Sequence, residues 1–354
     1  MIPKRIKESK TYQRVHAFAK KYEKWTIPLM LLGGLSGDVL QYTKLDIREK
    51  FMILSVYVLV STGTLLIMNY PAASEHKVWR KLLIISPFAH QFAIGGLLAT
   101  SLLFYWFSGA FSVTWPIILI VVLFMFFNEF LREHFLRPTV QVGVLSFSMF
   151  SLLAILFSFI FNSLEPQIFV LAGVASLVFM ICFTLLLTRV GAMKNKRFTM
   201  IATSSIVFLL MNGAYYLNII PPIPLSVREA TMAYNVARSD GDYLLVKQPE
   251  SWLEALIPGV TMTIKIGDPI YAFTNVAAPT SLSTTLVHRW EYYDPSSNNW
   301  MTKSILSYGM TGGRDEGYRG YSYKTSLLAG RWRVTVETTR GQVLTRIPFY
   351  VVYK

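Results

Sequence analysis

The sequence predicts an α-helical membrane bundle of seven transmembrane helices, followed by a C-terminal all-β, immunoglobulin-like antiparallel sandwich. Three observations lead to this fold class. The 354 residues are 53% hydrophobic and only 15% charged, and apolar runs of about twenty residues recur along the chain. Prolines cluster where the last run ends, and short strand-like segments follow it. This composition excludes a purely soluble enzyme and a disordered chain.

Composition divides the chain into four regions: a basic interfacial arm at 1–24, a seven-span transmembrane domain at 25–220, a Pro-rich linker at 221–242 and a β-sandwich domain at 243–354. In the arm, Tyr12, Val15 and Tyr22 recur at helical spacing, apart from most of the lysines. We expect a helix that lies in the membrane interface. A regulatory docking helix is the alternative.

Each predicted span is long enough to cross about 30 Å of hydrocarbon as a helix. The first is the weakest, because it carries three glycines and Asp38. Two of these glycines, Gly33 and Gly37, form a small-x-x-x-small pair that favours close packing against another helix of the same chain over dimerisation. The predicted spans are 25–42, 51–69, 82–106, 111–130, 139–161, 167–187 and 199–220.

The basic residues predict the orientation. With a cytoplasmic N-terminus, the inner segments hold seventeen Lys and Arg, and the outer loops hold three. The positive-inside rule expects such an imbalance, and an odd number of spans then places the C-terminal domain outside the cytoplasm. Beyond residue 220 there are 14 basic and 11 acidic residues. Most of the net charge of +14 is therefore explained by topology and by the lipid bilayer, and no nucleic-acid partner is expected.

After the prolines, the pattern becomes that of strands broken by turns, apart from a short surface helix predicted at 226–238. Alternation is clearest in the predicted strand 331–337. There, Trp332, Val334 and Val336 are predicted to face the core, and Arg331, Arg333 and Glu337 to face water. Trp290 is likewise predicted to be a core residue. The predicted strands are 243–247, 260–266, 270–275, 284–293, 300–308, 318–324, 331–337 and 343–352.

Several motifs in this region occur in an order that resembles a bacterial C-terminal domain of unknown function. They are LVHRWEYY at 286–293, GYRGYSYK at 317–324, GRWRVTV at 330–336, GQVL at 341–344 and FYV at 349–351. The resemblance covers about residues 285–353, and in that family the domain often follows a multi-span membrane half. It implies a multi-pass protein of the bacterial inner membrane with a periplasmic C-terminal domain. It transfers no activity.

Polar residues inside the predicted spans are the candidates for a translocation path. They are Asp38, His90, Gln91 and Asn212. Ionisable groups at this depth are costly unless they are paired or hydrated. One hypothesis is a transporter or membrane-embedded enzyme in which these residues line a polar cavity. The other is local: Asp38 reaches the outer interface, and His90 bonds to a neighbouring helix.

The sequence contains no constellation that predicts catalysis, a cofactor or a metal. Glu129 and Glu133 have the spacing of helical ion pairs with Arg132 and Arg137, and the residue three before His134 is a leucine, so the Glu-x-x-His spacing of a metal site is absent. The histidine at position 288 is the last in the chain and has no cysteine or evident orienting partner. An enzyme is therefore not the favoured class.

A face that mixes aromatic residues with arginines is the candidate binding surface of the C-terminal domain. Such a face suits a glycan, an acidic polymer or a protein partner, and exposed cation-π and cross-strand pairs are the alternative. We expect a non-enzymatic membrane protein whose outer domain binds an envelope component or protein partner. The candidate residues are Arg289, Tyr293, Arg319, Tyr321, Tyr323, Arg331 and Arg333.

Overall fold

A computed structural model describes residues 47–70, 77–130, 137–189, 194–239, 242–248, 259–279, 282–311 and 317–354. The chain divides into two compact units, and each is described by itself. The helical unit comprises Met1–Phe104, Ile117–Phe157 and Pro166–Ala214. The β unit comprises Tyr105–Pro116, Ser158–Glu165 and Tyr215–Lys354, so it holds two helix connections as well as the strands. The predicted arm at 1–24 and the predicted span at 25–42, with Asp38, lie outside the described residues.

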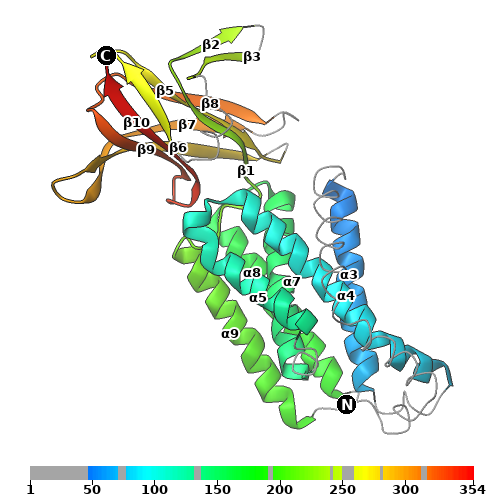
Figure 1. Cartoon of the computed structure of the whole chain (residues 1–354). Helices are drawn as coiled ribbons and strands as arrows, with labels where there is room; N and C mark the ends of the chain where they lie inside the picture. Colours follow the sequence, from blue (N-terminus) through cyan, green and yellow to red (C-terminus); the bar gives the residue numbers. More distant parts are fainter. Residues whose placement is uncertain are drawn as a thin grey trace. The chain divides into compact units, whose positions relative to one another are not determined.

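Six α-helices occupy the predicted positions of the remaining spans. They are α3 (Ile47–Asn69), α4 (Lys77–Ser108), α5 (Phe111–Phe130), α7 (Pro138–Phe161), α8 (Pro166–Arg189) and α9 (Arg197–Tyr216), the last preceded by the short 3₁₀ helix η2 (Lys194–Lys196) (Figure 1). Pro138 and Pro166 begin their helices, where a missing N–H costs nothing. The seventh predicted span was too long, because α9 ends at Tyr216.

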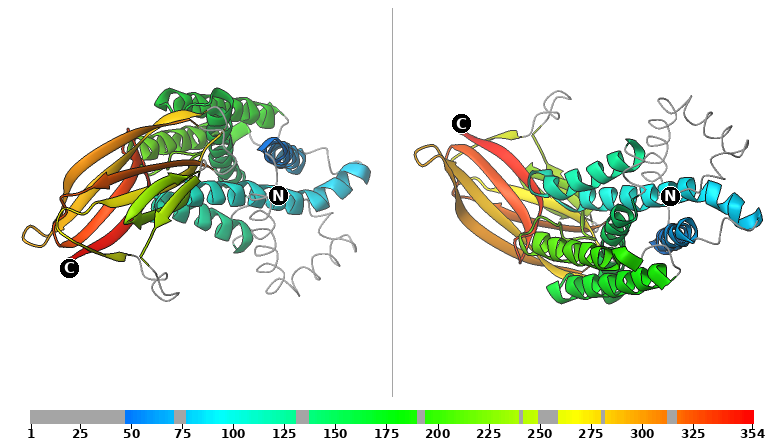
Figure 2. Two further views of the ribbon diagram at one scale, coloured as in Figure 1. Left: turned by 90° about the horizontal axis from the view of Figure 1, so that it is seen from above. Right: turned by 90° about the horizontal axis from the view of Figure 1, so that it is seen from below.

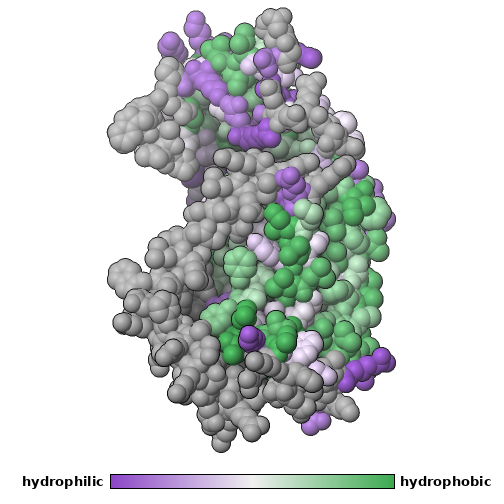
Figure 3. All heavy atoms as spheres, turned by 90° about the vertical axis from the view of Figure 1, so that its right-hand side faces the viewer, coloured by the Kyte–Doolittle hydropathy of each residue, from purple (hydrophilic) through white to green (hydrophobic). Residues whose placement is uncertain are grey.

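Five of the described helices are long and apolar enough to cross a membrane: Glu49–Asn69, Lys81–Ser108, Pro138–Phe161, Pro166–Arg189 and Arg197–Tyr216. The described part of α5, Phe111–Phe126, is a shorter apolar helix. Large apolar side chains are exposed along these helices, and they cover much of the described helical surface in Figure 3. A soluble protein rarely exposes apolar surface so continuously, whereas a bilayer solvates it.

Small residues bring neighbouring helices together. A Cβ atom on Gly96 of α4 would lie 2.3 Å from the ring of Tyr57 on α3, so only glycine allows this approach. Between α7 and α9, the hydroxyl groups of Ser146 and Ser204 are 2.9 Å apart and form a buried hydrogen bond. The described bundle is thus held by close packing and by buried hydroxyl pairs.

The described residues of the β unit form ten strands in three sheets. The five-stranded sheet has the order β4 (Val260–Ile264), β10 (Val343–Tyr353), β9 (Gly330–Thr338), β6 (Ser283–Asp294) and β7 (Asn299–Thr311). The three-stranded sheet has the order β1 (Ser226–Ala233), β5 (Ile270–Ala277) and β8 (Tyr318–Lys324). β2 (Asn235–Ser239) and β3 (Asp242–Val246) form a separate hairpin. Figure 2 shows the long strands of the C-terminal region, coloured yellow to red, from two further directions.

Two fold predictions for this region were wrong. The short helix predicted at 226–238 is instead β1 and β2, because pairing of Ser226–Ala233 with β5 decides its conformation over any local helical pattern. The sheets are also not all antiparallel, since β10 and β4 pair in parallel. The five-stranded sheet is therefore mixed, and an immunoglobulin-like sandwich is not evident.

The two larger sheets share an apolar core. Met232, Ile270 and Ala272 from the three-stranded sheet pack in one buried cluster with residues of the five-stranded sheet, among them Trp290 and Trp332. The cluster also contains Val334 and Val336, so the predicted core residues are confirmed. Both indole N–H groups are satisfied: that of Trp290 donates to Ser322 Oγ at 3.0 Å, and that of Trp332 to the carbonyl of Leu328 at 2.8 Å.

Candidate binding surfaces of the C-terminal domain

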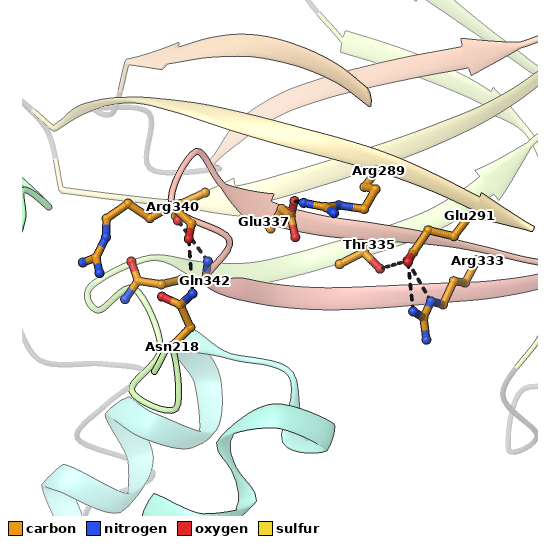
Figure 4. Close-up of polar contacts among 9 residues, drawn as sticks. Asn218, Arg289, Glu291, Arg333, Thr335, Glu337, Arg340 and Gln342 are labelled. Carbon is orange, nitrogen blue, oxygen red and sulfur yellow. Dashed lines mark hydrogen bonds and ion pairs between the residues drawn. The ribbon is translucent and has the colours of Figure 1, made fainter. Parts of the chain in front are cut away.

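The face of the five-stranded sheet that points away from the core carries two ion pairs. Arg333 donates from Nε and Nη2 to the two carboxylate oxygens of Glu291, at 2.7 and 3.0 Å, and Thr335 donates to the same carboxylate at 2.6 Å. Arg289 is paired with Glu337, its Nε 2.9 Å from Oε1 (Figure 4). Each carboxylate thus holds one arginine of the predicted binding set.

These carboxylates lie deeper than the sequence predicted. Glu337 is only 5% exposed, so the prediction that it faces water was wrong. Its position on the outer face is as expected, but the paired Arg289 covers it. Burial would raise the pKa of Glu291, but hydrogen bonds from Arg333 and Thr335 and the positive charges of Arg333 and Arg289 outweigh burial and lower this pKa. Both pairs therefore stabilise the sheet, and Arg289 and Arg333 are largely neutralised.

Aromatic rings cover the end of the same face. The rings of Tyr293 and Trp300 are 5.3 Å apart, and the guanidinium of Arg331 lies 5.6 and 5.4 Å from them. Arg333 also lies 4.1 Å from the ring of Trp300. Arg331 forms no ion pair with the other residues that the structure describes, and it is exposed. This end therefore presents one cation held over two rings.

The outer face of the three-stranded sheet is a surface of tyrosines. Ring centroids lie 5.9 Å apart between Tyr271 and Tyr321, 5.5 Å between Tyr271 and Tyr323, and 6.1 Å between Tyr243 and Tyr321. Tyr321 is 42% exposed and Tyr323 is 55% exposed. At its edge, Arg319 pairs with Asp242 at 2.5 Å. Tyr271, Tyr321 and Tyr323 of this sheet, together with Tyr243 from β3 of the separate hairpin, are called the tyrosine surface.

The structure therefore divides the predicted binding residues between two faces. Arg289, Tyr293, Arg331 and Arg333 lie on the five-stranded sheet, and Arg319, Tyr321 and Tyr323 on the three-stranded sheet. The two outer faces point away from each other, because the sheets share the core between them. The sequence analysis missed Tyr243, Tyr271 and Trp300. Alternation within one strand shows which face a residue takes, but it does not show which other strand lies beside it.

A buried polar network lies between the sheets. Nδ1 of His288 is 2.9 Å from Ser322 Oγ, and Nε2 is 3.2 Å from Thr274 Oγ1, which in turn is 2.6 Å from the hydroxyl of Tyr308. Burial lowers the pKa of His288 to about 4. Burial also raises the pKa of Tyr308 to about 12, against the opposing hydrogen bond to Thr274. The imidazole is neutral and fully buried, so it holds the sheets together and is not presented to a substrate.

Two of the predicted intramembrane polar residues make local contacts. Nδ1 of His90 lies 3.1 Å from the carbonyl oxygen of Ser61 and 3.3 Å from Thr64 Oγ1, both on α3. Asn212 donates to the carbonyl of Phe208 in its own helix at 2.8 Å. No hydrogen bond among the described residues joins His90 to Asn212, and Gln91 is partly exposed on α4.

Metal ligands do not gather in the part of the chain that the structure describes. No group of three or more His, Cys, Asp or Glu side chains lies within reach of one ion there. The predicted ion pairs at the end of α5 fall largely outside these residues, because 131–136 and the side chain of Glu129 are not described.

Fold and surfaces together define a multi-span membrane protein with a C-terminal β domain. Residues 283–351 of this domain match the family described as "Protein of unknown function (DUF2914)". The match lies on the segment where the sequence analysis found its resemblance, and it assigns no activity.

The comparisons with curated proteins and with solved structures give no further information about the class of protein. No curated protein matches the chain. Among solved structures, the alkylpurine DNA glycosylase AlkC of Pseudomonas fluorescens, bound to DNA containing an abasic site analog, aligns at 10% identity over 85% of this chain and 97% of that chain, with a TM-score of 0.24. So low a score does not indicate a common fold.

The buried histidine predicts an acid-sensitive domain. His288 has a pKa of about 4 in the folded domain and about 6.5 when unfolded, so the unfolded chain binds the extra proton first. Protonation of His288 does not reduce the free energy of unfolding above about pH 6.5. Below that pH, the free energy of unfolding falls, by up to about 3 kcal/mol as the pH approaches 4. Denaturant unfolding of the full chain, followed by tryptophan fluorescence, should show this slope. In His288→Gln the slope between pH 6.5 and 4.5 should flatten. An unchanged slope would refute the assignment.

Removing one buried carboxylate should cost more than removing an exposed one. Glu291→Gln takes the bidentate partner from Arg333 and an acceptor from Thr335, so we expect a loss of about 1–3 kcal/mol in the free energy of unfolding. The matched control is Glu229→Gln, whose partner Lys247 is similarly exposed, and its loss should stay below about 1 kcal/mol. Equal losses in both variants would contradict the role given to Glu291.

Proposed function

We propose that this chain is a non-enzymatic protein of the bacterial inner membrane that holds its C-terminal β domain in the periplasm and binds an envelope polysaccharide through the tyrosine surface. The observation that carries the proposal is the row of neighbouring rings formed by Tyr243, Tyr321, Tyr271 and Tyr323, in which Tyr321 and Tyr323 are exposed and the other two are half-buried. The proposal has two parts, the side of the membrane and the ligand.

The composition of the β unit supports the periplasmic side. The connection between α4 and α5 belongs to this unit, and the amide of Ala110 donates to the carbonyl of Val343 at 3.2 Å. Arg346 also donates to Ser112 Oγ at 2.9 Å. Neither Tyr105–Pro116 nor Ser158–Glu165, the other connection in the unit, contains Lys or Arg. Loops free of basic residues favour the outer side, so the strands joined to them belong there too.

The opposite ends of the same helices carry the basic residues. Lys81 lies in the first turns of α4, Arg137 directly precedes α7, and Arg189 ends α8. These ends are joined to the segments that hold most of the seventeen basic residues of the predicted inner side. Charge therefore separates the two ends of the described helices in the direction expected for a cytoplasmic basic side.

The chemistry of the tyrosine surface supports a polysaccharide ligand. Ring faces pack against the apolar C–H faces of sugars, and phenol hydroxyl groups exchange hydrogen bonds with sugar hydroxyls. A tyrosine side chain also has few rotatable bonds, so fixing it on a ligand costs little entropy. Arg319, at the edge of this surface, is paired with Asp242, so its charge is offset by a carboxylate.

One observation favours the alternative of a transporter or membrane-embedded enzyme. His90 is 1% exposed, and its Nε2 has no hydrogen-bond partner. An unsatisfied imidazole nitrogen inside a span is a candidate for proton or solute contact. The other contacts of His90 are to one neighbouring helix, however, as the local hypothesis expects. We therefore place binding by the β domain first.

The membrane side can be tested with two matched cysteines in a Cys182→Ser background. Ser297 is exposed in the turn between β6 and β7, and Lys196 is exposed before α9. In spheroplasts, a membrane-impermeant maleimide should label Ser297→Cys and should leave Lys196→Cys unlabelled until the cells are lysed. The reverse pattern would overturn the periplasmic placement.

Ligand binding can be tested by sedimentation of the detergent-solubilised full chain with purified peptidoglycan sacculi. The double variant Tyr321→Ser/Tyr323→Ser loses two stacking rings, each contributing about 1 kcal/mol, so we expect binding to weaken at least about tenfold. The control is Tyr350→Ser, an exposed tyrosine on the other sheet. Soluble glycan fragments should compete. Equal binding by both variants would refute the tyrosine surface as the ligand site.

A further inference from the structure

The turn between β9 and β10 is fixed to the chain segment that follows α9. Within the turn, the amide of Gly341 donates to the carbonyl of Thr338 at 2.9 Å, and Gly341 has a φ of +83°, which favours glycine. Asn218 Nδ2 donates to the carbonyl of Arg340 at 3.2 Å, and Gln342 Nε2 donates to the carbonyl of Ile220 at 3.1 Å (Figure 4). These contacts set the position of Arg340.

The side chain of Arg340 is stacked on the two tyrosines that end α9. Its guanidinium carbon lies 4.4 Å from the ring centroid of Tyr215 and 5.5 Å from that of Tyr216. Its Nη1 is buried without a hydrogen-bond partner, and Arg340 forms no ion pair with a carboxylate of the described residues. Its positive charge is therefore not neutralised by the chain around it.

The helix ends that belong to the β unit carry aromatic residues of the kind found at membrane interfaces. Tyr216 is the last residue of a membrane-length helix and is 58% exposed, and the following Leu217 is 72% exposed. Trp106 and Trp115, at the facing ends of α4 and α5 in the same unit, are also exposed. Tryptophan and tyrosine gather at membrane interfaces, where the ring meets lipid and the polar atom meets water.

We propose that Arg340, Tyr215 and Tyr216 form a site for the headgroup phosphate of a phospholipid in the leaflet on the side of the β domain. The planar guanidinium can hold two phosphate oxygens at once, and it stacks on the ring that fixes its orientation. Exposed Tyr216 and Leu217 then contact the acyl chains below the phosphate. An anionic headgroup is favoured, because no described carboxylate is paired here that would attract a headgroup amine.

Arg346 shows what distinguishes this site. It comes from the same hairpin, and it donates to Ser112 at the start of α5. Its guanidinium, however, is acted on by the charge of Arg333 as well as by the carboxylates of Glu291 and Glu337. Arg346 therefore belongs to the charge network of the five-stranded sheet. Arg340 has no ion pair among the described residues, so an anion at Arg340 would not have to compete with a carboxylate.

The test is native mass spectrometry of the full chain in detergent, titrated with phosphatidylglycerol. We expect Arg340→Gln to bind this lipid about tenfold more weakly, Arg340→Lys to retain part of the affinity, and Lys265→Gln, a cation elsewhere in the β domain, to bind normally. A glycolipid without phosphate should bind equally weakly to all four proteins. Thermal unfolding identifies any variant that does not fold. If Arg340→Gln fails to fold, Arg340→Lys decides, with an expected loss of several-fold.

Three outcomes would overturn the proposal. The first is unchanged phosphatidylglycerol affinity in the folded arginine variants, the second is equal binding of the glycolipid, and the third is competition by a free anion. Competition by millimolar inorganic phosphate would instead identify a site for the free anion and would overturn the assignment to a lipid. The sacculus experiment does not depend on Arg340, so failure of this proposal leaves the tyrosine surface untouched.

Discussion

The exclusion of water from the hydrocarbon core is the constraint on which the rest of this structure depends. In lipid, a backbone N–H or C=O group without a hydrogen-bond partner costs several kcal/mol. The apolar segments therefore have to be helices, in which these groups bond to one another within the same segment. The same cost drives charge out of the spans. Basic residues are left at Lys81, Arg137 and Arg189, at the helix ends remote from the connections of the β unit.

Within the β domain, the two outer faces differ in how their polar side chains are paired. On the five-stranded sheet, Glu291 and Glu337 take up Arg333 and Arg289, so the charges are used for pairing across strands β6 and β9. On the three-stranded sheet, the tyrosines keep their rings exposed beside one another. Side chains that are already paired with one another contribute little free energy to binding a ligand. Exposed rings contribute more, because the ligand removes their apolar surface from water. This difference is why we assign the ligand to the tyrosine surface.

The sequence predicted those features that depend on local periodicity. Helix positions follow from the length of apolar runs, and the burial of Trp332 and Val334 follows from alternation along one strand. Features that depend on distant partners could not be predicted in this way. Strands β1 and β2 were taken for a helix, because their pairing with β5 and β3 is not visible locally. The parallel pairing of β4 with β10 joins segments about eighty residues apart, and Glu337 is buried by an arginine from another strand.

The β9–β10 hairpin connects the two parts of the proposed function. It runs from the core through Trp332, and its turn is bonded at Arg340 to the segment after α9, so lipid and sacculus would act on one compact unit. Such a link does not by itself make the sites cooperative. A ligand shifts an equilibrium only by its difference in affinity between two states, and the hydrogen bonds of Asn218 and Gln342 define one state of the hairpin. The simplest consequence is geometric: a phosphate held at Arg340 would set the height of the tyrosine surface above the bilayer, and thereby which layer of the envelope that surface can reach.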